Sequence, residues 1–553
     1  MDVITFDKAT DSKELLDDLR IGASASKPTH TRVIILVQNY WDSFAKKGCK
    51  RPIIGFEFSI DTGTAKPVCC RKPTYGFYEN DIIMKQIAEL LKNGWIRLCQ
   101  GPWGSIIVLA AKPHQEKCTH INDFIWRMCV SYRKLNAVTK PFQFPIPRCD
   151  VSITIIGNGA KTLYLIALDN RQGYHQVSVR TEDQEKLAFF APDGNKYCFT
   201  VLPFGPCNAP SFYTAMMKVF QDEWDSLFQE SLQDISKTPS SNLVFTKTGQ
   251  IAINGDIFRF GSNVIIDDIL LWGSDLDLMF VYLECVFRVS KKYRSNFKLN
   301  KCEFFSDRVE FVGHDILSAG NSPASSKFKS ISDWELPQTG QMLFSFIGLI
   351  THYAKFLPYH EMRIKPLRRL LKQYFRTKIP LMSWTPSLIE LFHDIKLSVT
   401  SSPLLSRFDA SKPTFLKTDW SSKGMGFILM QPANDDESTN AIKELHANGT
   451  CLFDLTPDGP RLLPVQFGSR SCTTIESKLH SFLGEVATVR WAIGHLKRYL
   501  WGNHFWLLCD CISVKAILEY TGSITVVMQW AQELLAYNFT VVHRDKKNDE
   551  RRR

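Results

Sequence analysis

Hydrophobic residues along the chain form short continuous runs and helical stripes between polar stretches. In residues 84–93 they recur every three or four positions, which predicts an amphipathic helix. Two continuous apolar runs, Ser105–Ala111 and Leu163–Leu168, have the length of buried strands. Pro210 precedes another helical stripe, so a helix is predicted to begin there.

The sharpest pattern is Val264–Trp272, in which an Asp pair lies between two aliphatic triplets. Aspartate is unfavourable inside strands, so this pattern predicts two strands with Asp267 and Asp268 at the turn between them. An isolated Asp pair is more often an ordinary turn. The flanking triplets make the pair a candidate for chemistry.

The remaining segments have less regular patterns of hydrophobic residues, which still predict their general structure. Cys302–Ile316 is expected to be a hairpin that turns at Ser306 and Asp307. The segment Phe328–Phe392 has helical character, and breaks are predicted at its prolines: Pro337, Pro358, Pro366 and Pro380. Residues 221–260 lose apolar density, and residues 236–241 are expected to form an inserted surface loop. A polar stretch, Pro432–Arg461, interrupts an α/β segment that begins near Phe408.

Composition narrows the class of protein. The 553 residues allow about three to five domains at roughly 100–200 residues each. Apolar residues make up 44% and charged residues 22%, which excludes a collagen-like, coiled-coil or wholly disordered chain. The aliphatic runs are far shorter than the ~18–20 residues of a membrane span, and the first residues do not resemble a signal peptide. We therefore expect an intracellular protein, in a cytoplasmic particle or the nucleus, without a membrane partner.

Charge and cysteine content add two expectations. The net charge of +11 permits binding to polyanions without demonstrating it. None of the fifteen cysteines forms a Cys-x-x-Cys pair, so free thiols are favoured over a disulfide framework or a zinc site.

Carboxylates that follow or interrupt apolar strands require an explanation, because an unpaired buried carboxylate is costly. Asp169 directly follows the run Leu163–Leu168, and Asp267 and Asp268 lie between apolar triplets. Three clustered carboxylates would suit Mg²⁺ or Mn²⁺. Two such ions can activate a primer hydroxyl and stabilise the leaving pyrophosphate.

Seven segments, in order, resemble motifs of the reverse transcriptase of gypsy-type (metavirus-like) long-terminal-repeat retrotransposons and their retroviral relatives. They are Trp126–Asn136, Phe144–Arg148, Ala167–Asp169 with Gly173–Val177, Phe199–Gly205 with Asn208–Pro210, Ile265–Leu270, Lys298–Phe304 and Phe311–His314. The first has WRMCVSYRKLN where the family has WRMCVDYRKLN, and the fifth has IIDDIL where it has YLDDIL. The resemblance runs, with interruptions, from about residue 51 to the C-terminus.

The resemblance implies a role for each matching residue. Asp169, Asp267 and Asp268 match the family's catalytic metal-binding triad, with Asp169 and Asp267 as direct ligands. The substrate-binding positions are Lys112 and Arg127 on the triphosphate, Tyr174 under the sugar, Phe204 and Gly205 on the pocket floor, and Phe311, Val312 and Gly313 at the primer grip. Without the order of the motifs, Arg127 is more readily explained as a solvated strand residue, and Tyr174 and Phe204 as core residues.

A second set of matches resembles the family's ribonuclease H domain. Asp419 matches the carboxylate of its first strand, Glu485 the glutamate of its helix, Asp510 a later strand-end aspartate and His543 its histidine. The first three would be metal ligands, since carboxylates from two strands and a helix can meet at a two-metal hydrolytic site. Taken alone, Glu485 is equally readable as a solvated helix residue.

Several departures from the family pattern bear on activity. The family's fourth ribonuclease H carboxylate, about ten residues after the histidine, is absent from this chain. Ile265 replaces an aromatic residue and Ser131 an aspartate, and the insertions at 220–264 and 432–461 are long. Asp61-Thr62-Gly63 spells an aspartic protease triplet, but the residues after it look like the start of the family's fingers. We expect a fragment of a Pol polyprotein, or a reading frame broken from one.

The expected fold is α+β: a right-hand polymerase (fingers, palm, thumb) followed by an α/β ribonuclease H-like domain. The predicted boundaries are an extension or linker over 1–50, fingers and palm over 51–320, thumb and connection over 321–405, and the ribonuclease H-like domain, C-terminally truncated, over 406–553. The resemblance implies an RNA-directed DNA polymerase with two Mg²⁺ or Mn²⁺ ions per active site. Its implied partners are an RNA and DNA template-primer, deoxynucleoside triphosphates, and the protease and integrase segments of Pol.

Two other classes stay open. One is a catalytically degenerate, transposon-derived protein that still binds nucleic acid, and retained duplex binding without incorporation would identify it. The other is an interaction protein that keeps only the scaffold, which would have neither template affinity nor a carboxylate cluster.

Overall fold

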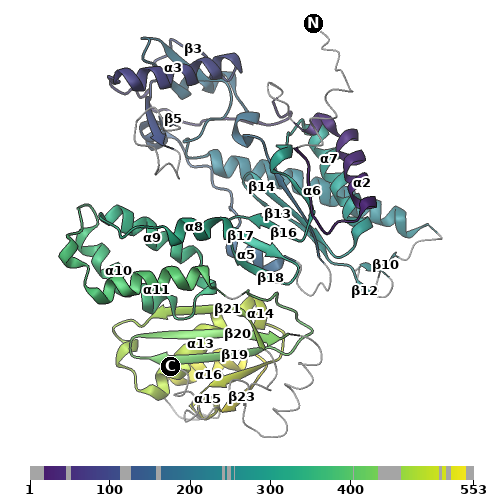
Figure 1. The fold of residues 1–553 in the computed structure, drawn as a ribbon, viewed down its shortest axis with the longest axis vertical. Helices are drawn as coiled ribbons and strands as arrows, with labels where there is room; N and C mark the ends of the chain where they lie inside the picture. Colours follow the sequence, from purple (N-terminus) through teal and green to yellow (C-terminus); the bar gives the residue numbers. More distant parts are fainter. Residues whose placement is uncertain are drawn as a thin grey trace. The chain divides into compact units, whose positions relative to one another are not determined.

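The computed structural model describes residues 18–44, 52–111, 126–156, 163–238, 243–245, 251–253, 256–402, 404–433, 462–509, 513–518 and 525–543. The chain divides into two compact units, Met1–Val312 and Gly313–Arg553 (Figure 1).

A five-stranded sheet forms the centre of the first unit. Its strands, in spatial order, are β1 (Arg20–Ile21), β15 (Glu303–Ser306), β6 (Tyr164–Asp169), β14 (Asp268–Gly273) and β13 (Phe260–Ile265). The central strand β6 is antiparallel to both of its neighbours. It has the apolar sequence Tyr-Leu-Ile-Ala-Leu before its terminal Asp169, which fits a strand buried on both faces.

Two long helices, α6 (Ala209–Ser236) and α7 (Leu276–Tyr293), pack against this sheet and against each other (Figure 1). The Asp275 side chain accepts a hydrogen bond from Leu278 N and so starts α7, and Arg294, with φ +58°, ends it. The helix α2 (Lys27–Asn39) joins them, because Arg32 pairs with Asp277 and lies over the Phe280 ring. The predicted N-terminal extension therefore contributes a strand and a helix to this unit.

The first unit also contains short sheets and small helices. The strands β4 (Ile106–Ala111) and β5 (Trp126–Ser131) form an antiparallel ribbon. The remaining elements are α3 (Phe77–Lys92), α4 (Arg133–Val138), α5 (Cys149–Ile155), the pair β2 (Glu57–Phe58) and β7 (Ser178–Val179), and the sheet of β3 (Ile96–Leu98), β9 (Lys196–Phe199) and β8 (Ala188–Phe190). The helix predicted over 84–93 is confirmed and starts seven residues earlier.

The structure contradicts two sequence-based predictions for this unit: the insertion after residue 220 and the hairpin over 302–316. Residues 221–236 continue α6 rather than leaving the fold, because Trp224, Phe228 and Leu232 are buried on its inner face. The segment that follows provides a small sheet of β10 (Leu243–Phe245), β11 (Ile251–Ile253) and β12 (Asp256–Ile257).

The hairpin predicted over 302–316 is also not formed as expected. β15 pairs with β6, and the next strand, β16 (Arg308–Phe311), belongs to a different sheet. Phe304 and Phe305 are buried in the core of the first unit, which holds β15 in the five-stranded sheet, hereafter the palm sheet.

The second unit begins with the hairpin of β17 (His314–Leu317) and β18 (Gly320–Pro323) and continues as helices. These are α8 (Phe328–Ser332), α9 (Gly340–His352), α10 (His360–Tyr374) and α11 (Pro386–Thr400). Pro366 lies inside α10 instead of breaking it. Ile364, Leu367 and Leu370 of that helix are buried, so packing outweighs the local preference of proline.

A second five-stranded sheet completes this unit. Its spatial order is β21 (Leu462–Ser471), β20 (Gly424–Pro432), β19 (Phe415–Ser421), β22 (Phe505–Cys509) and β23 (Phe539–His543). The first three strands are antiparallel, and β22 and β23 run parallel to β19. The helices are α13 (Ser481–His495), α14 (Lys497–Leu500), α15 (Ser513–Leu518) and α16 (Thr525–Leu535) (Figure 1).

Alternation along β19 separates the two faces of this sheet. Leu416 packs in the core that includes α13, whereas Phe415 belongs to a small cluster with Leu508 and Val542. Asp419 has the parity of Phe415, so it lies on the face opposite α13. In the described ranges, no helix is long and apolar enough to cross a membrane.

Candidate active sites

The palm sheet brings the three predicted polymerase carboxylates together. β14 is antiparallel to β6 in a register that places Asp268 directly opposite Asp169. Asp267 occupies the turn between β13 and β14, where Ile266 adopts φ +53°. The backbone NH of Asn170 donates to the Asp267 carbonyl at 3.1 Å, which ties the turn to the end of β6.

Burial and repulsion between carboxylates perturb Asp267. Desolvation, followed by the charges of Asp268 and Asp169, raises the pKa of Asp267 from 3.8 to about 6. A group of like charges that disfavours ionisation in this way is stabilised by a cation, so the site has the electrostatics of a cation site.

A lysine already supplies one positive charge. Lys301 Nζ lies 2.8 Å from Asp169 Oδ2. It belongs to a short 3₁₀ turn (Leu299–Lys301) directly before β15, and β15 lies beside β6. Sequence analysis placed Lys301 inside a motif but assigned it no role.

The donor set fits a hard divalent ion. All three side chains offer carboxylate oxygens, which Mg²⁺ and Mn²⁺ prefer. Asp267 Oδ1 is buried, so a charge on this carboxylate needs a partner. Over the same residues, no three acidic, histidine or cysteine side chains are already arranged as a metal-binding group. Asp169 would have to share its oxygens between Lys301 and a metal.

Aromatic residues pack beside Asp267. The ring of Tyr174 lies 5.1 Å, centroid to centroid, from both Phe204 and Tyr213. Burial and then the Asp267 charge raise the pKa of Tyr174 to about 12. A side chain at Gly173 would overlap the Tyr213 hydroxyl and Asp267 Oδ1, so glycine is required for this close approach.

The loop that carries Phe204 and Gly205 is held by a fingers residue. Phe204 is 56% exposed, and Gly205 has φ +114°, a conformation that favours glycine. Asn136 Nδ2 donates to the Gly205 carbonyl at 3.0 Å, and Asn136 Oδ1 accepts from Cys207 N at 2.9 Å. Asn136 is thus a second residue whose part in the site sequence analysis did not assign.

The other predicted substrate-binding residues lie on β5, at the end of β16 or outside the described residues. Arg127 is exposed on β5, opposite Ala110 of the fingers ribbon. Lys112 falls outside the described residues. Phe311 is buried, and Val312 and Gly313 have positive φ (+48° and +74°) in the turn after β16. No described contact tests these roles, which stay predictions.

Two of the four predicted ribonuclease H residues have described side chains. Asp419 lies on β19, and Glu485 is buried on α13. A side chain at Gly484 would overlap the Trp420 indole, so α13 approaches β19 closely at Trp420, on the face of the sheet opposite to that of Asp419. Asp510 lies outside the described residues. His543 is described by its backbone alone, as the register partner of Cys509.

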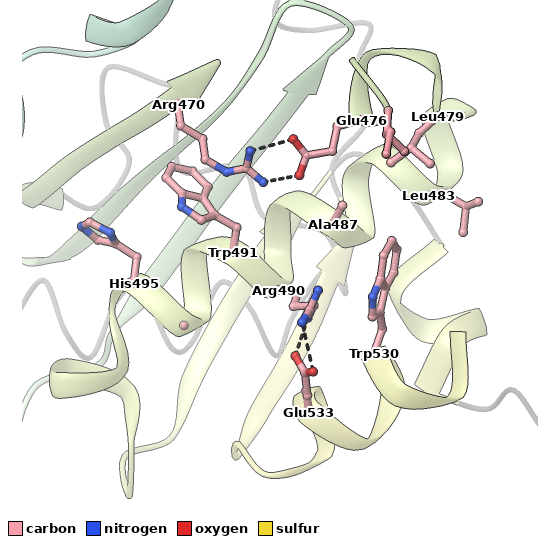
Figure 2. A pocket seen from close by; sticks show the side chains of 12 residues that line it. Arg470, Glu476, Leu479, Leu483, Ala487, Arg490, Trp491, His495, Trp530 and Glu533 are labelled. Carbon is pink, nitrogen blue, oxygen red and sulfur yellow. Dashed lines mark hydrogen bonds and ion pairs between the residues drawn. The ribbon is translucent and has the colours of Figure 1, made fainter. Parts of the chain in front are cut away.

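The second unit also holds a cavity of about 710 Å³ between β21, α13 and α16 (Figure 2). Two ion pairs line it: Arg470 with Glu476, and Arg490 with Glu533. Each arginine also lies near a tryptophan ring, Trp491 and Trp530 respectively. None of the predicted carboxylates with a described side chain lines this cavity.

Two family models match the chain. Residues 122–316 match the reverse transcriptase (RNA-dependent DNA polymerase) family, and residues 409–537 match the RNase H-like domain found in reverse transcriptase. Both families depend in general on divalent metal ions.

The curated relatives are Pol polyproteins of transposons. The chain is 27% identical over 501 residues to the retrovirus-related Pol polyprotein from transposon opus of Drosophila melanogaster, covering 89% of this chain and 43% of the relative. It is 23% identical over 453 residues to that from transposon gypsy of the same fly, covering 80% and 37%. The chain therefore spans less than half the length of these relatives.

Solved structures share the fold. The foamy viral protease-reverse transcriptase in complex with dsDNA matches with a TM-score of 0.69 and 19% identity, covering 99% of this chain and 98% of that chain. The same protein in complex with RNA/DNA hybrid matches with a TM-score of 0.68 and 19% identity, covering 99% and 64%. The predicted α+β architecture, polymerase hand followed by an RNase H-like domain, is confirmed at the level of fold.

Proposed function

We propose that this chain, which belongs to the reverse transcriptase family and carries an RNase H-like domain of a retrotransposon Pol polyprotein, catalyses templated DNA synthesis. The observation that carries the proposal is the register of β6 and β14. It sets Asp169 opposite Asp268, with Asp267 in the adjoining turn, its pKa raised to about 6 by burial and its two neighbours.

In this proposal Asp169 and Asp267, with Asp268, hold two Mg²⁺ or Mn²⁺ ions. When bound, these ions activate the primer 3′-hydroxyl and stabilise the leaving pyrophosphate. No protein nucleophile is needed, so the chain's contribution is to bind and orient. Tyr174 lies under the sugar of the incoming deoxynucleoside triphosphate, with Phe204 and Gly205 beside it.

Positive charge completes the nucleotide and template contacts. Arg127 and Lys112 neutralise the triphosphate. Phe311, Val312 and Gly313 support the primer terminus. The net charge of +11 favours a nucleic-acid backbone, and binding should weaken as salt rises. The protease and integrase segments of a longer Pol polyprotein are further proposed partners.

Primer extension tests the polymerase. Wild-type chain and an Asp267→Asn, Asp268→Asn double variant are compared on poly(rA)/oligo(dT) with Mg²⁺ or Mn²⁺. We expect extension by the wild type and none by the variant, with equal duplex binding, because the substitutions remove charge from the metal site and leave the fold. Duplex binding without extension by either protein would favour the degenerate, nucleic-acid-binding class.

We propose hydrolysis of the RNA strand of RNA–DNA hybrids as a second activity. The supporting observations are the match of residues 409–537 to the RNase H-like family and the positions of Asp419 on β19 and of the buried Glu485 on α13. Asp510 and His543 would complete the site. Cleavage of a labelled hybrid by wild type but not by Asp419→Asn would support it. No cleavage by either would show that the carboxylates of this chain are insufficient.

A further inference from the structure

Tyr359 connects the helical part of the second unit to the predicted hydrolytic carboxylate. Its hydroxyl lies 3.3 Å from Asp419 Oδ2 and donates a hydrogen bond to it. Tyr359 immediately precedes α10, whereas Asp419 is 60 residues later on β19. The four residues that the family resemblance supplied for this site do not include Tyr359.

The tyrosine ring lies across a strand pair. Asp419 and Gly426 are register partners on β19 and β20, so their side-chain positions share one face. A Cβ at Gly426 would lie 3.1 Å from Tyr359 Cε1 and 3.3 Å from Cδ1. The ring therefore sits against the backbone of Gly426, with its hydroxyl reaching the neighbouring carboxylate.

The surroundings of Tyr359 hold it in an unfavourable backbone conformation. Its φ of +53° is left-handed, which is costly for a residue with a Cβ. The residue is 40% exposed, so core burial does not explain its place. The start of α10 is fixed to the sheet instead: Glu361 N donates to Ser469 Oγ at 3.0 Å, and α10 packs along β21.

We infer that Tyr359 is a positioning residue for Asp419, orienting the carboxylate for a divalent ion. The inference rests on the proposed hydrolytic function of this domain. A donor on Oδ2 fixes the plane of the carboxylate. Hydrogen bonds of this kind to ligating carboxylates typically change metal affinity or activity by about 10- to 100-fold when removed.

The test measures metal binding separately from cleavage. All variants are made in the full chain carrying Asp267→Asn and Asp268→Asn, so that the polymerase site contributes little. Binding of Mn²⁺ alone is followed by the electron paramagnetic resonance signal of the free ion. We expect Tyr359→Phe, which keeps the ring, to weaken Mn²⁺ binding about tenfold, with an unchanged unfolding midpoint. Hybrid cleavage should need about tenfold more Mn²⁺ and recover at saturation.

Two further variants sharpen the test. Tyr374→Phe is the matched control. Tyr374 is the last residue of α10, and the substitution removes a hydroxyl that contacts Ser383 Oγ at 3.0 Å. It should leave Mn²⁺ binding unchanged. Gly426→Ala displaces the Tyr359 ring without removing the hydroxyl, and should weaken binding in the same direction as Tyr359→Phe.

The outcomes separate the inference from the function on which it rests. If Asp419→Asn does not weaken Mn²⁺ binding, the proposed metal site fails and the inference falls with it. If Asp419→Asn weakens binding and Tyr359→Phe does not, the positioning role alone is overturned. Faster hybrid cleavage by Tyr359→Phe would also overturn it, because the tyrosine would then obstruct the carboxylate.

Discussion

Lys301 Nζ lies 2.8 Å from Asp169 Oδ2, so an ammonium group occupies one oxygen of the carboxylate that ends β6. The pair crosses between neighbouring strands, since Lys301 lies two residues before the start of β15. Asp169 is also opposite Asp268 and close enough to raise the pKa of Asp267. The lysine thus offsets part of the negative charge of the cluster and competes with any metal for Asp169.

Replacing Lys301 by methionine is expected to tighten Mn²⁺ binding to the chain without nucleic acid. The substitution keeps a long side chain, frees Asp169 Oδ2 and removes a nearby positive charge. Two unit charges 4 Å apart interact by roughly 1–4 kcal/mol between bulk water and a protein surface, so an increase of about tenfold in affinity is expected. Equilibrium Mn²⁺ titration measures it.

Lys298→Met is the matched control for this substitution. Lys298 is exposed and belongs to the same loop, and its backbone NH, which the substitution keeps, donates to the Asp169 carbonyl at 2.9 Å. It should change Mn²⁺ affinity much less. Weaker binding by Lys301→Met would contradict competition and indicate that the lysine holds Asp169 in a metal-ready orientation.

Stability should depend on pH through Asp267. Its pKa is about 6 in the folded chain against an ordinary 3.8, so between about pH 4 and 6 the folded state binds the extra proton. The carboxyl therefore stabilises the fold at low pH, and this contribution is lost as pH rises through 6. Relative to wild type, Asp267→Asn should become more stable as pH rises from 4 to 7.

Urea unfolding of both proteins across this range measures the difference in free energy of unfolding. His175 titrates in the opposite sense, because burial lowers its pKa to about 4, but it is present in both proteins and cancels. Added Mg²⁺ should raise the stability of wild type more than that of Asp267→Asn at pH 7. A difference that is flat with pH would contradict the raised pKa.

The close approach at Gly173 gives a third prediction. An added methyl group would overlap the Tyr213 hydroxyl and Asp267 Oδ1, so Gly173→Ala is expected to destabilise the chain by about 1–3 kcal/mol and to reduce primer extension. Tyr213→Phe removes the hydroxyl, which is the nearest obstacle, and leaves the ring carbon that carried it 2.7 Å from the added Cβ. The double variant should regain part of the stability, and strictly additive losses would show that the two residues do not interfere.

The carboxylate turn could be predicted because its signal is local. Two aliphatic triplets around Asp267 and Asp268 specify a hairpin, and the hairpin alone places Asp267 in its turn and Asp268 at the first position of β14. The strand that pairs with this hairpin, β6, is distant from it in the sequence. Asp169 meets Asp268 only because β6 lies next to β14, and its position there came from family resemblance rather than from spacing.

The contacts that sequence analysis missed depend on strand order. Lys301 reaches Asp169 across 132 residues because β15 pairs with β6. The local pattern of residues 302–316 favoured a self-contained hairpin instead, since alternation does not reveal which strand is the partner. Pro366 was predicted to break a helix that tertiary packing maintains. Tyr359 and Asp419 are joined by a packing of α10 on the sheet that no local pattern encodes.

The contact between Gly484 and Trp420 gives the last prediction. A Cβ at Gly484 would overlap the indole of Trp420, the residue after Asp419, so Gly484→Ala should force α13 away from β19. Hydrogen exchange in peptides that cover residues 481–495 should become faster, and hybrid cleavage should fall. Trp420→Ala removes the obstacle, so exchange in the double variant should return toward that of Trp420→Ala alone. Gly494→Ala, a site on the same helix with open space around it, is the control and should leave exchange unchanged or slower. Equal effects of the two glycine substitutions would mean that helix propensity, rather than the approach to Trp420, decides the result.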